Sequence, residues 1–159
     1  MNSPKPVHRV LFVCHGNICR SPMAEFVFRD LAARRGVAGR FSADSAATSD
    51  EEIGNPVHPG TVRALRARGV PMAPHRAAQM TRADYARYDL LLGMEESNVR
   101  RMLRITGGDP DGKVLRLLDF SAHPRDIDDP WYTGDFDATY RDIREGCEAL
   151  LDALLREQG

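Results

Sequence analysis

Apolar and polar positions along this chain follow two periods, one typical of buried strands and one typical of amphipathic helices. Apolar runs predict strands at residues 8–14, 89–94 and 113–120, and a weaker run predicts another at residues 40–48. Helical patterns cover residues 21–36, 58–69, 95–106 and 136–158, with a helical turn or short helix at residues 81–88. The pattern therefore predicts strands that alternate with helices along the whole chain.

The first predicted helix carries start and stop signals. Ser21 is a candidate N-cap, Pro22 would occupy the first helical position, and Gly36 would end the helix. Alternation of strands and helices favours an α/β fold with a four-stranded parallel sheet and helices on both faces. Because no repeat or linker interrupts the segments, we expect residues 1–159 to form a single domain, with residues 1–7 as a loose tail.

Composition narrows the range of partners and compartments. The chain has 159 residues and a formal net charge of −1, so charge gives no reason to expect nucleic acid or a membrane as a partner. No segment approaches the roughly 20 apolar residues that span a bilayer, and the start has no apolar signal core. Cys14, Cys19 and Cys147 make a poor disulfide framework, which suits a reducing compartment. We therefore expect a cytoplasmic protein.

The candidate chemistry lies in the stretch CHGNICRSP, between the first predicted strand and the first predicted helix. At the carboxyl end of such a strand, a loop and a helix N-terminus can surround an anion. Gly16 and Asn17 tolerate the left-handed backbone of a curled loop, and Arg20 can contact two phosphate oxygens. The same field favours the thiolate of Cys14, which could then attack a bound phosphate.

Each of these residues also has an ordinary structural explanation. A cysteine after a strand is more often a core residue, an arginine at a helix start is usually solvated, and the spacing C-x5-R arises often by chance. Their combination with Gly, Asn and Ser-Pro in one loop favours a phosphate site. Cleavage of a phosphate ester also needs a proton donor. The segment RDIDDP offers Asp126, Asp128 and Asp129, although its ordinary explanation is a polar turn, which is common for Asp near Pro.

The segment VLFVCHGNICRSPMAE closely resembles the signature C-x-G-N-x-C-R-S-P of the low-molecular-weight protein tyrosine phosphatases. DSAATSD, HRAAQMTRADYARYDLLLGMEESN and DDPWYTGDFDATY resemble later segments of that family in the same order. The resemblance implies a flavodoxin-like fold (phosphotyrosine protein phosphatase I-like). It also implies hydrolysis of protein phosphotyrosine and small aryl phosphates without a cofactor. No metal site is expected, because the Cys and His residues lack structural-zinc spacing.

The resemblance assigns roles within the loop. Cys14 would be the nucleophile that forms a cysteinyl-phosphate, and Arg20 would clamp the phosphate oxygens. Ser21 would donate its hydroxyl to the Cys14 sulfur, Asn17 would hold the bend with Ser45 as its partner, and a supporting polar network would include His75. The phosphate cradle would consist of His15, Gly16, Asn17, Ile18, Cys19 and Arg20.

The resemblance also selects residues outside the loop. The pattern D-P-aromatic selects Asp129 as the general acid and, in the second step, the base, with Trp131 and Tyr132 at the substrate rim. Glu51 stands where some members of the family carry an aromatic residue that lines the cleft. At the rim Glu51 would disfavour acidic peptides by like-charge repulsion, and otherwise it would be solvated surface.

Cys19 has two explanations. A loop wrapped around phosphate brings its ends together, so Cys14 and Cys19 could form a reversible disulfide on oxidation, a use of the second cysteine that the resemblance supports. The alternative is a small side chain packed under the loop. The expected partner is a phosphotyrosine-containing protein, with a tyrosine kinase as one candidate, and the expected state is a monomer or weak dimer.

Three other functions compete with this hypothesis. A protein arginine phosphatase belongs to the same family, but that branch carries Thr where this chain has Ile18. A thioredoxin-coupled arsenate reductase needs a further pair of cysteines, which residues 79–96 lack. A non-catalytic phosphate-binding module would be expected to lose Cys14 or Asp129, and both are present.

Overall fold

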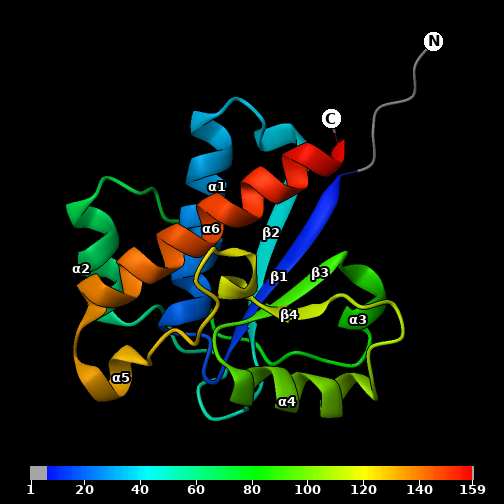
Figure 1. The fold of residues 1–159 in the computed structure, drawn as a ribbon. Coiled ribbons are helices and arrows are strands. Elements are labelled where there is room, and N and C mark those ends of the chain that lie inside the picture. Colours follow the sequence, from blue (N-terminus) through cyan, green and yellow to red (C-terminus); the bar gives the residue numbers. More distant parts are fainter. Residues whose placement is uncertain (1–6, 159) are drawn as a thin grey trace.

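The computed structural model describes residues 7–158, in which four strands form one parallel sheet of order β2-β1-β3-β4 (Figure 1). This arrangement confirms the predicted α/β fold with a four-stranded parallel sheet. The strands are β1 (His8–Cys14), β2 (Phe41–Ala47), β3 (Leu90–Gly93) and β4 (Val114–Arg116).

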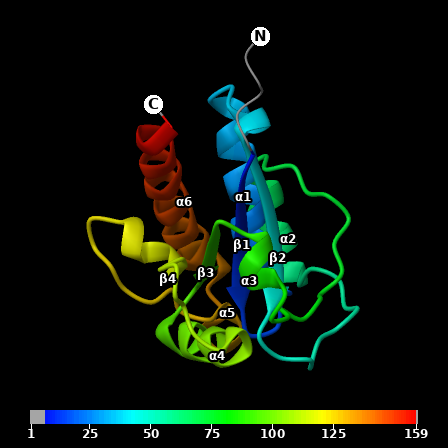
Figure 2. The same ribbon diagram turned by 90° about the vertical axis from the view of Figure 1, so that its right-hand side faces the viewer.

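Helices connect the strands and cover both faces of the sheet (Figures 1 and 2). One face is packed mainly by the first and last helices, and the other by the helix that follows β3. The helices are α1 (Arg20–Arg34), α2 (Pro59–Ala67), α3 (Asp84–Arg87), α4 (Glu96–Thr106), α5 (Pro130–Thr133) and α6 (Phe136–Gln158), with 3-10 turns η1 (Ala38–Arg40) and η2 (Leu117–Phe120).

Strand β1 is central and buried on both sides. Val10 and Phe12 face the core formed with α1 and α6, whereas Leu11 and Val13 face the core formed with α4. A strand that is buried on both faces needs an almost continuous apolar run, which VLFVC supplies. At the end of β1, Cys14 pairs in register with Ala47 of β2, and Val13 pairs with Gly93 of β3.

The segment 113–120 differs from the prediction of one strand. Only Val114–Arg116 is a strand, and the chain then turns into η2. The turn lets two consecutive residues, Leu117 and Leu118, both be buried, which a strand with alternating faces against one layer would not allow. The Asp119 carboxylate stabilises the turn by accepting from the Arg116 backbone N–H at 2.9 Å.

The start of α1 also differs from the prediction. The helix begins at Arg20, so Cys19 stands at the N-cap position, while Ser21 and Pro22 lie in the first turn. The Ser21 hydroxyl contacts the Cys14 sulfur instead of capping the helix. Pro22 is tolerated because the first-turn N–H groups have no partner within the helix.

The predicted loose tail, apart from Val7, lies outside the described residues. Val7 itself is exposed. Within residues 7–158, none of the helices combines the length and the apolar character needed to cross a membrane.

Candidate active site

The loop between β1 and α1 curls around the Cys14 sulfur. Asn17 adopts a φ of 59°, and within residues 7–158 it is the one non-glycine residue with a positive φ. Its side-chain oxygen accepts from the Ala78 backbone N–H at 3.1 Å, and its backbone carbonyl accepts from His75 Nε2 at 3.0 Å. Asparagine tolerates this backbone better than most residues, and these two contacts hold the loop from outside.

Three donors surround the sulfur of Cys14. The backbone N–H groups of Asn17 and Ser21 lie 3.3 and 3.4 Å from Sγ, and the Ser21 hydroxyl lies 3.0 Å from it. The Asn17 side-chain amide donates to the Ser21 hydroxyl oxygen at 2.8 Å. Because that oxygen accepts from Asn17, its own hydrogen can be donated to the Cys14 sulfur at 3.0 Å or to the Ala46 carbonyl at 3.4 Å, and the sulfur is the nearer of the two. This arrangement stabilises negative charge on Cys14.

The predicted pairing of Asn17 with Ser45 is wrong. The Ser45 hydroxyl donates to the Glu25 carboxylate at 2.7 Å. Ser45 is paired in register with Phe12, two residues before β1 ends, so it lies below the level of the curled loop. Asn17 contacts Ser21 and Ala78 instead.

Arg20 is 1% exposed and is directed toward a set of oxygen acceptors. One terminal nitrogen donates to the Ile127 carbonyl at 2.8 Å, and the other lies 3.3 Å from the Asp129 carboxylate. Glu95 contacts the same guanidinium at 3.4 Å. Glu95 was not singled out from the sequence. Its position two residues after the end of β3 could have indicated it, because ligands bind beyond the carboxyl ends of the strands in such a sheet.

Of the three candidate carboxylates in RDIDDP, only Asp129 lines the pocket. One of its oxygens caps α5 by accepting from the Trp131 backbone N–H at 3.0 Å, and the other faces Arg20. Asp128 is exposed. Asp126 accepts from the Glu96 backbone N–H at 2.9 Å and does not line the pocket.

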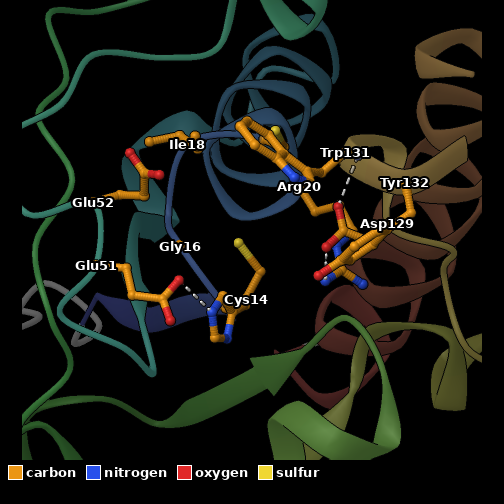
Figure 3. Close-up of a pocket in the computed structure, with 11 residues that line it drawn as sticks. Cys14, Gly16, Ile18, Arg20, Glu51, Glu52, Asp129, Trp131 and Tyr132 are labelled. Carbon is orange, nitrogen blue, oxygen red and sulfur yellow. Dashed lines mark hydrogen bonds and ion pairs between the residues drawn. The ribbon is translucent and has the colours of Figure 1, made fainter. Parts of the chain in front are cut away.

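Two walls flank Cys14 in the pocket (Figure 3). Trp131 and Tyr132 form one wall with Asp129, and the residues Trp131 and Tyr132 are 59% and 85% exposed. Glu51 and Glu52 lie on the opposite side (Figure 3). Glu51 thus lies at the rim, while its side chain is also 65% exposed to solvent, so both of its predicted placements describe it in part. Sequence reasoning missed Glu52. The lining comprises Cys14, His15, Gly16, Ile18, Cys19, Arg20, Glu51, Glu52, Asp129, Trp131 and Tyr132.

The other two cysteines are buried: Cys19 lines the pocket near Cys14, and Cys147 lies in the core. Desolvation, with the negative groups of Cys14 and Asp129 acting in the same direction, raises the pKa of Cys19 to about 12. Burial in the core of α6 also raises the pKa of Cys147 well above the ordinary range. Both are therefore neutral thiols at physiological pH. Among residues 7–158, no group of three or more His, Cys, Asp or Glu side chains is arranged to hold a metal ion.

Comparisons with known proteins show the family of this chain. The family model described as low molecular weight phosphotyrosine protein phosphatase matches residues 9–159. The chain belongs to this family of protein phosphatases. It is 41% identical to the low molecular weight protein-tyrosine-phosphatase YfkJ of Bacillus subtilis, over 94% of this chain and 97% of that protein. It is 40% identical to the Homo sapiens low molecular weight phosphotyrosine protein phosphatase, over 90% of this chain and 93% of that protein.

The fold of this phosphatase is also that of its relatives. The crystal structure of YfkJ from Bacillus subtilis superposes with a TM-score of 0.93 at 39% identity, over 99% of this chain and 100% of that chain. The crystal structure of a low molecular weight protein tyrosine phosphatase from Streptococcus pyogenes gives a TM-score of 0.84 at 36% identity, covering 93% of each chain. The chain is therefore a hydrolase of the protein-tyrosine-phosphatase family.

Proposed function

We propose that this phosphatase hydrolyses protein phosphotyrosine and small aryl phosphates through a cysteinyl-phosphate on Cys14. The observation that carries the proposal is the convergence of three groups from distant segments on one pocket. The Cys14 sulfur lies at its centre, Arg20 and Asp129 lie within 3.3 Å of each other beside it, and Trp131 and Tyr132 supply aromatic surface at its rim.

In the first step the Cys14 thiolate attacks phosphorus and the bond to the aryl oxygen breaks. Asp129 transfers a proton to that oxygen, so the leaving group departs as a neutral phenol. Charge that spreads over the three equatorial oxygens is stabilised by Arg20 and by the loop amides from His15 onward. The Ser21 hydroxyl stabilises the sulfur anion before attack.

In the second step water attacks the phosphocysteine. The Asp129 carboxylate, now without its proton, accepts one from that water as the oxygen–phosphorus bond forms. The sulfur–phosphorus bond breaks, inorganic phosphate leaves, and Cys14 is again a thiolate. Both proton transfers pass through one carboxylate, that of Asp129.

The apolar lining supports an aryl substrate over phosphoarginine. Ile18 lines the pocket together with the aromatic side chain of Trp131, and both offer apolar surface to a phenyl ring. The substrate would be a phosphotyrosine protein, with a tyrosine kinase as one candidate. The low, odd cysteine count supports a reducing, cytoplasmic compartment. The arsenate reductase alternative is disfavoured because the third cysteine, Cys147, is fully buried in the core.

Turnover of p-nitrophenyl phosphate, a phosphotyrosine peptide and phosphoarginine by wild type and Cys14→Ser tests the nucleophile. We expect Cys14→Ser to lose turnover of all substrates and to retain the fold and phosphate binding. Substantial aryl phosphatase activity in Cys14→Ser would contradict the covalent mechanism. Faster turnover of phosphoarginine than of phosphotyrosine by wild type would favour the arginine phosphatase alternative.

A leaving-group series tests the acid. A general acid contributes about 10²–10⁴ in rate when the leaving group is poor, so Asp129→Asn should slow phosphotyrosine most and slow esters of acidic phenols least. Asp128→Asn is the matched control, because Asp128 is exposed and does not line the pocket. Equal losses across the series would remove Asp129 from this role, and a larger loss in Asp128→Asn would show that the neighbouring carboxylate is the acid.

A further inference from the structure

The wall opposite Trp131 and Tyr132 carries two carboxylates that the proposed chemistry does not use. Glu51 and Glu52 follow the end of β2 and line the pocket beside Cys14 (Figure 3). Ordinary surface glutamates are solvated and mobile, so the question is whether these two are held at the pocket.

The contacts of His15 hold the Glu51 side chain in place. Arg101 Nη1 lies 3.0 Å from His15 Nδ1, and a guanidinium can only donate, so Nδ1 must be the acceptor. The proton of the neutral ring is therefore on Nε2, which donates to Glu51 at 3.0 Å. The imidazole thus links Arg101 on one side to Glu51 on the other, and Arg101 does not line the pocket.

Glu52 is positioned by its stem and by an amide. A Cβ built at Gly16 would lie 3.3 Å from Glu52 Cγ, so the stem of Glu52 packs closely on the loop at Gly16. The side-chain amide of Asn55 donates to the Glu52 carboxylate at 2.5 Å. This donor is neutral. Within residues 7–158, no arginine or lysine forms an ion pair with either Glu51 or Glu52, so no cationic side chain of these two types neutralises their charge by direct contact.

Arg20, the arginine that lines the pocket, is buried and lies away from the pocket opening. Arg20 is 1% exposed and faces Glu95 and Asp129 at the base of the pocket. The phosphate group of a substrate would therefore contact the positive charge of Arg20 inside the pocket. The substrate residues that flank the phosphotyrosine would lie near the carboxylates of Glu51 and Glu52 at the pocket wall. We propose that Glu51 and Glu52 make this phosphatase select phosphotyrosine flanked by Lys or Arg and disfavour phosphotyrosine flanked by Asp or Glu.

This inference rests on the proposed hydrolysis of phosphotyrosine peptides. The expected size of the preference between peptides follows from the solvent exposure of the charged groups. Exposed charge pairs in proteins change equilibria by about two- to fivefold each, so two carboxylates together give about a tenfold preference. The preference should shrink with added salt, because solvent-exposed pairs are screened over about 8–10 Å at ordinary ionic strength.

The test compares two peptides that differ only in having Lys or Glu on both sides of phosphotyrosine. The measured quantity is the ratio of kcat/KM for the Lys peptide to kcat/KM for the Glu peptide within each variant. We expect about tenfold in wild type, a fall of about two- to fivefold in Glu51→Gln, and a ratio near one in Glu51→Gln/Glu52→Gln. Gln is nearly isosteric, so it keeps an oxygen that can accept from His15 while removing the charge.

Glu148→Gln provides the matched control. Glu148 lies on α6, pairs with Arg144 at 2.9 Å and does not line the pocket, so removing its charge should leave the ratio at the wild-type value. An effect of net charge alone would lower the ratio in this control as well and would overturn the assignment to Glu51 and Glu52.

Two further results would overturn the inference in different ways. If wild type turns over both peptides equally, the charge selection is wrong while the proposed function stands. The same holds if the preference survives in the double variant. If wild type turns over p-nitrophenyl phosphate but neither peptide, the proposed function on phosphotyrosine peptides fails, and the inference fails with it.

Discussion

Three cysteines of this chain occupy three different environments. Cys14 lies among the donors of the curled loop. Cys19 lines the pocket next to Arg20 but is buried, and desolvation raises its pKa to about 12. Cys147 is packed inside the core, where its thiol contacts the Ala24 carbonyl at 3.6 Å. Residue type alone therefore does not distinguish Cys14, the proposed nucleophile, from the other two cysteines. The hydrogen-bond donors around its sulfur do distinguish it.

Oxidation tests the role predicted for Cys19. Peroxide would convert the Cys14 thiolate to a sulfenic acid, and attack by the Cys19 sulfur would then form a disulfide and release water. Wild type should lose activity with peroxide and regain it with a thiol reductant. Cys19→Ser should be active before treatment, lose activity on oxidation and recover poorly. Recovery of Cys19→Ser equal to wild type would leave Cys19 as a packing residue only.

At the scale of elements, the contact between α6 and η2 depends on one glycine. A Cβ built at Gly146 would lie 2.6 Å from Leu117 Cγ, and Leu117 is fully buried. The apolar stripe of the sequence predicts the long helix α6. Because Gly146 has no side chain, η2 can approach α6 closely at this position. That turn leads into the segment that carries Asp129, so this packing helps to place the acid loop.

Gly146→Ala should therefore destabilise the fold. Alanine favours a helix over glycine by about 1 kcal/mol, but overpacking a filled core costs about 1–3 kcal/mol, and we expect the net free energy of unfolding to fall. Urea denaturation measures the change. Gly39→Ala is the control, because a Cβ there meets nothing within 4 Å. An unchanged or higher stability of Gly146→Ala would show that Leu117 moves aside at little cost.

At the scale of the whole molecule, the pocket is assembled from segments that the fold brings to one edge of the sheet. The loop after β1 supplies the phosphate cradle, and the segment after β2 supplies Glu51 and Glu52. Glu95 follows β3, and the segment before α6 supplies Asp129. The last of these segments is tied down at Arg125, which donates to Asp142 at 2.8 Å and to Glu145 at 2.9 Å on α6.

The pH dependence of stability tests this tether. The hydrogen bonds from Arg125 and Ser121 lower the pKa of Glu145 from its ordinary 4.5 to about 2. A lowered pKa in the folded state means that the stabilisation is complete above pH 4.5 and is lost as the pH falls toward 2. Both partners are about two-fifths exposed, so solvent screening keeps the effect modest.

Urea unfolding at pH 7 and pH 3 should therefore show a smaller acid-induced loss of stability in Glu145→Gln than in wild type. Glu148→Gln is the control, because it removes a carboxylate that pairs only within α6, and it should lose stability with acid much as wild type does. An acid-induced loss in Glu145→Gln equal to that of wild type would show that the tether contributes nothing to stability.

The sequence by itself determined the parallel sheet, the strand-to-helix loop and the set of residues in that loop. These features depend on neighbours in the chain: a run of five apolar residues, VLFVC, that ends at Cys14, and a helix pattern that begins a few residues later. Local patterns also placed the long helix α6 at Phe136–Gln158. Signals of this kind can be recognised without knowledge of tertiary contacts, because they depend only on the periodicity of apolar residues that are close together in the sequence.

Only the tertiary structure decided which distant groups meet. Arg20 contacts Glu95 and Asp129 across 75 and 109 positions of sequence, and no local pattern contains a separation of that size. The register of β1 against β2 places Ser45 below the loop. The Asn17 side chain therefore forms its hydrogen bonds with Ser21 and with the Ala78 backbone instead. Packing against the loop brought Glu51 and Glu52 to the pocket wall. Such contacts exist only once strand order and helix packing are set, so their partners are properties of the folded chain.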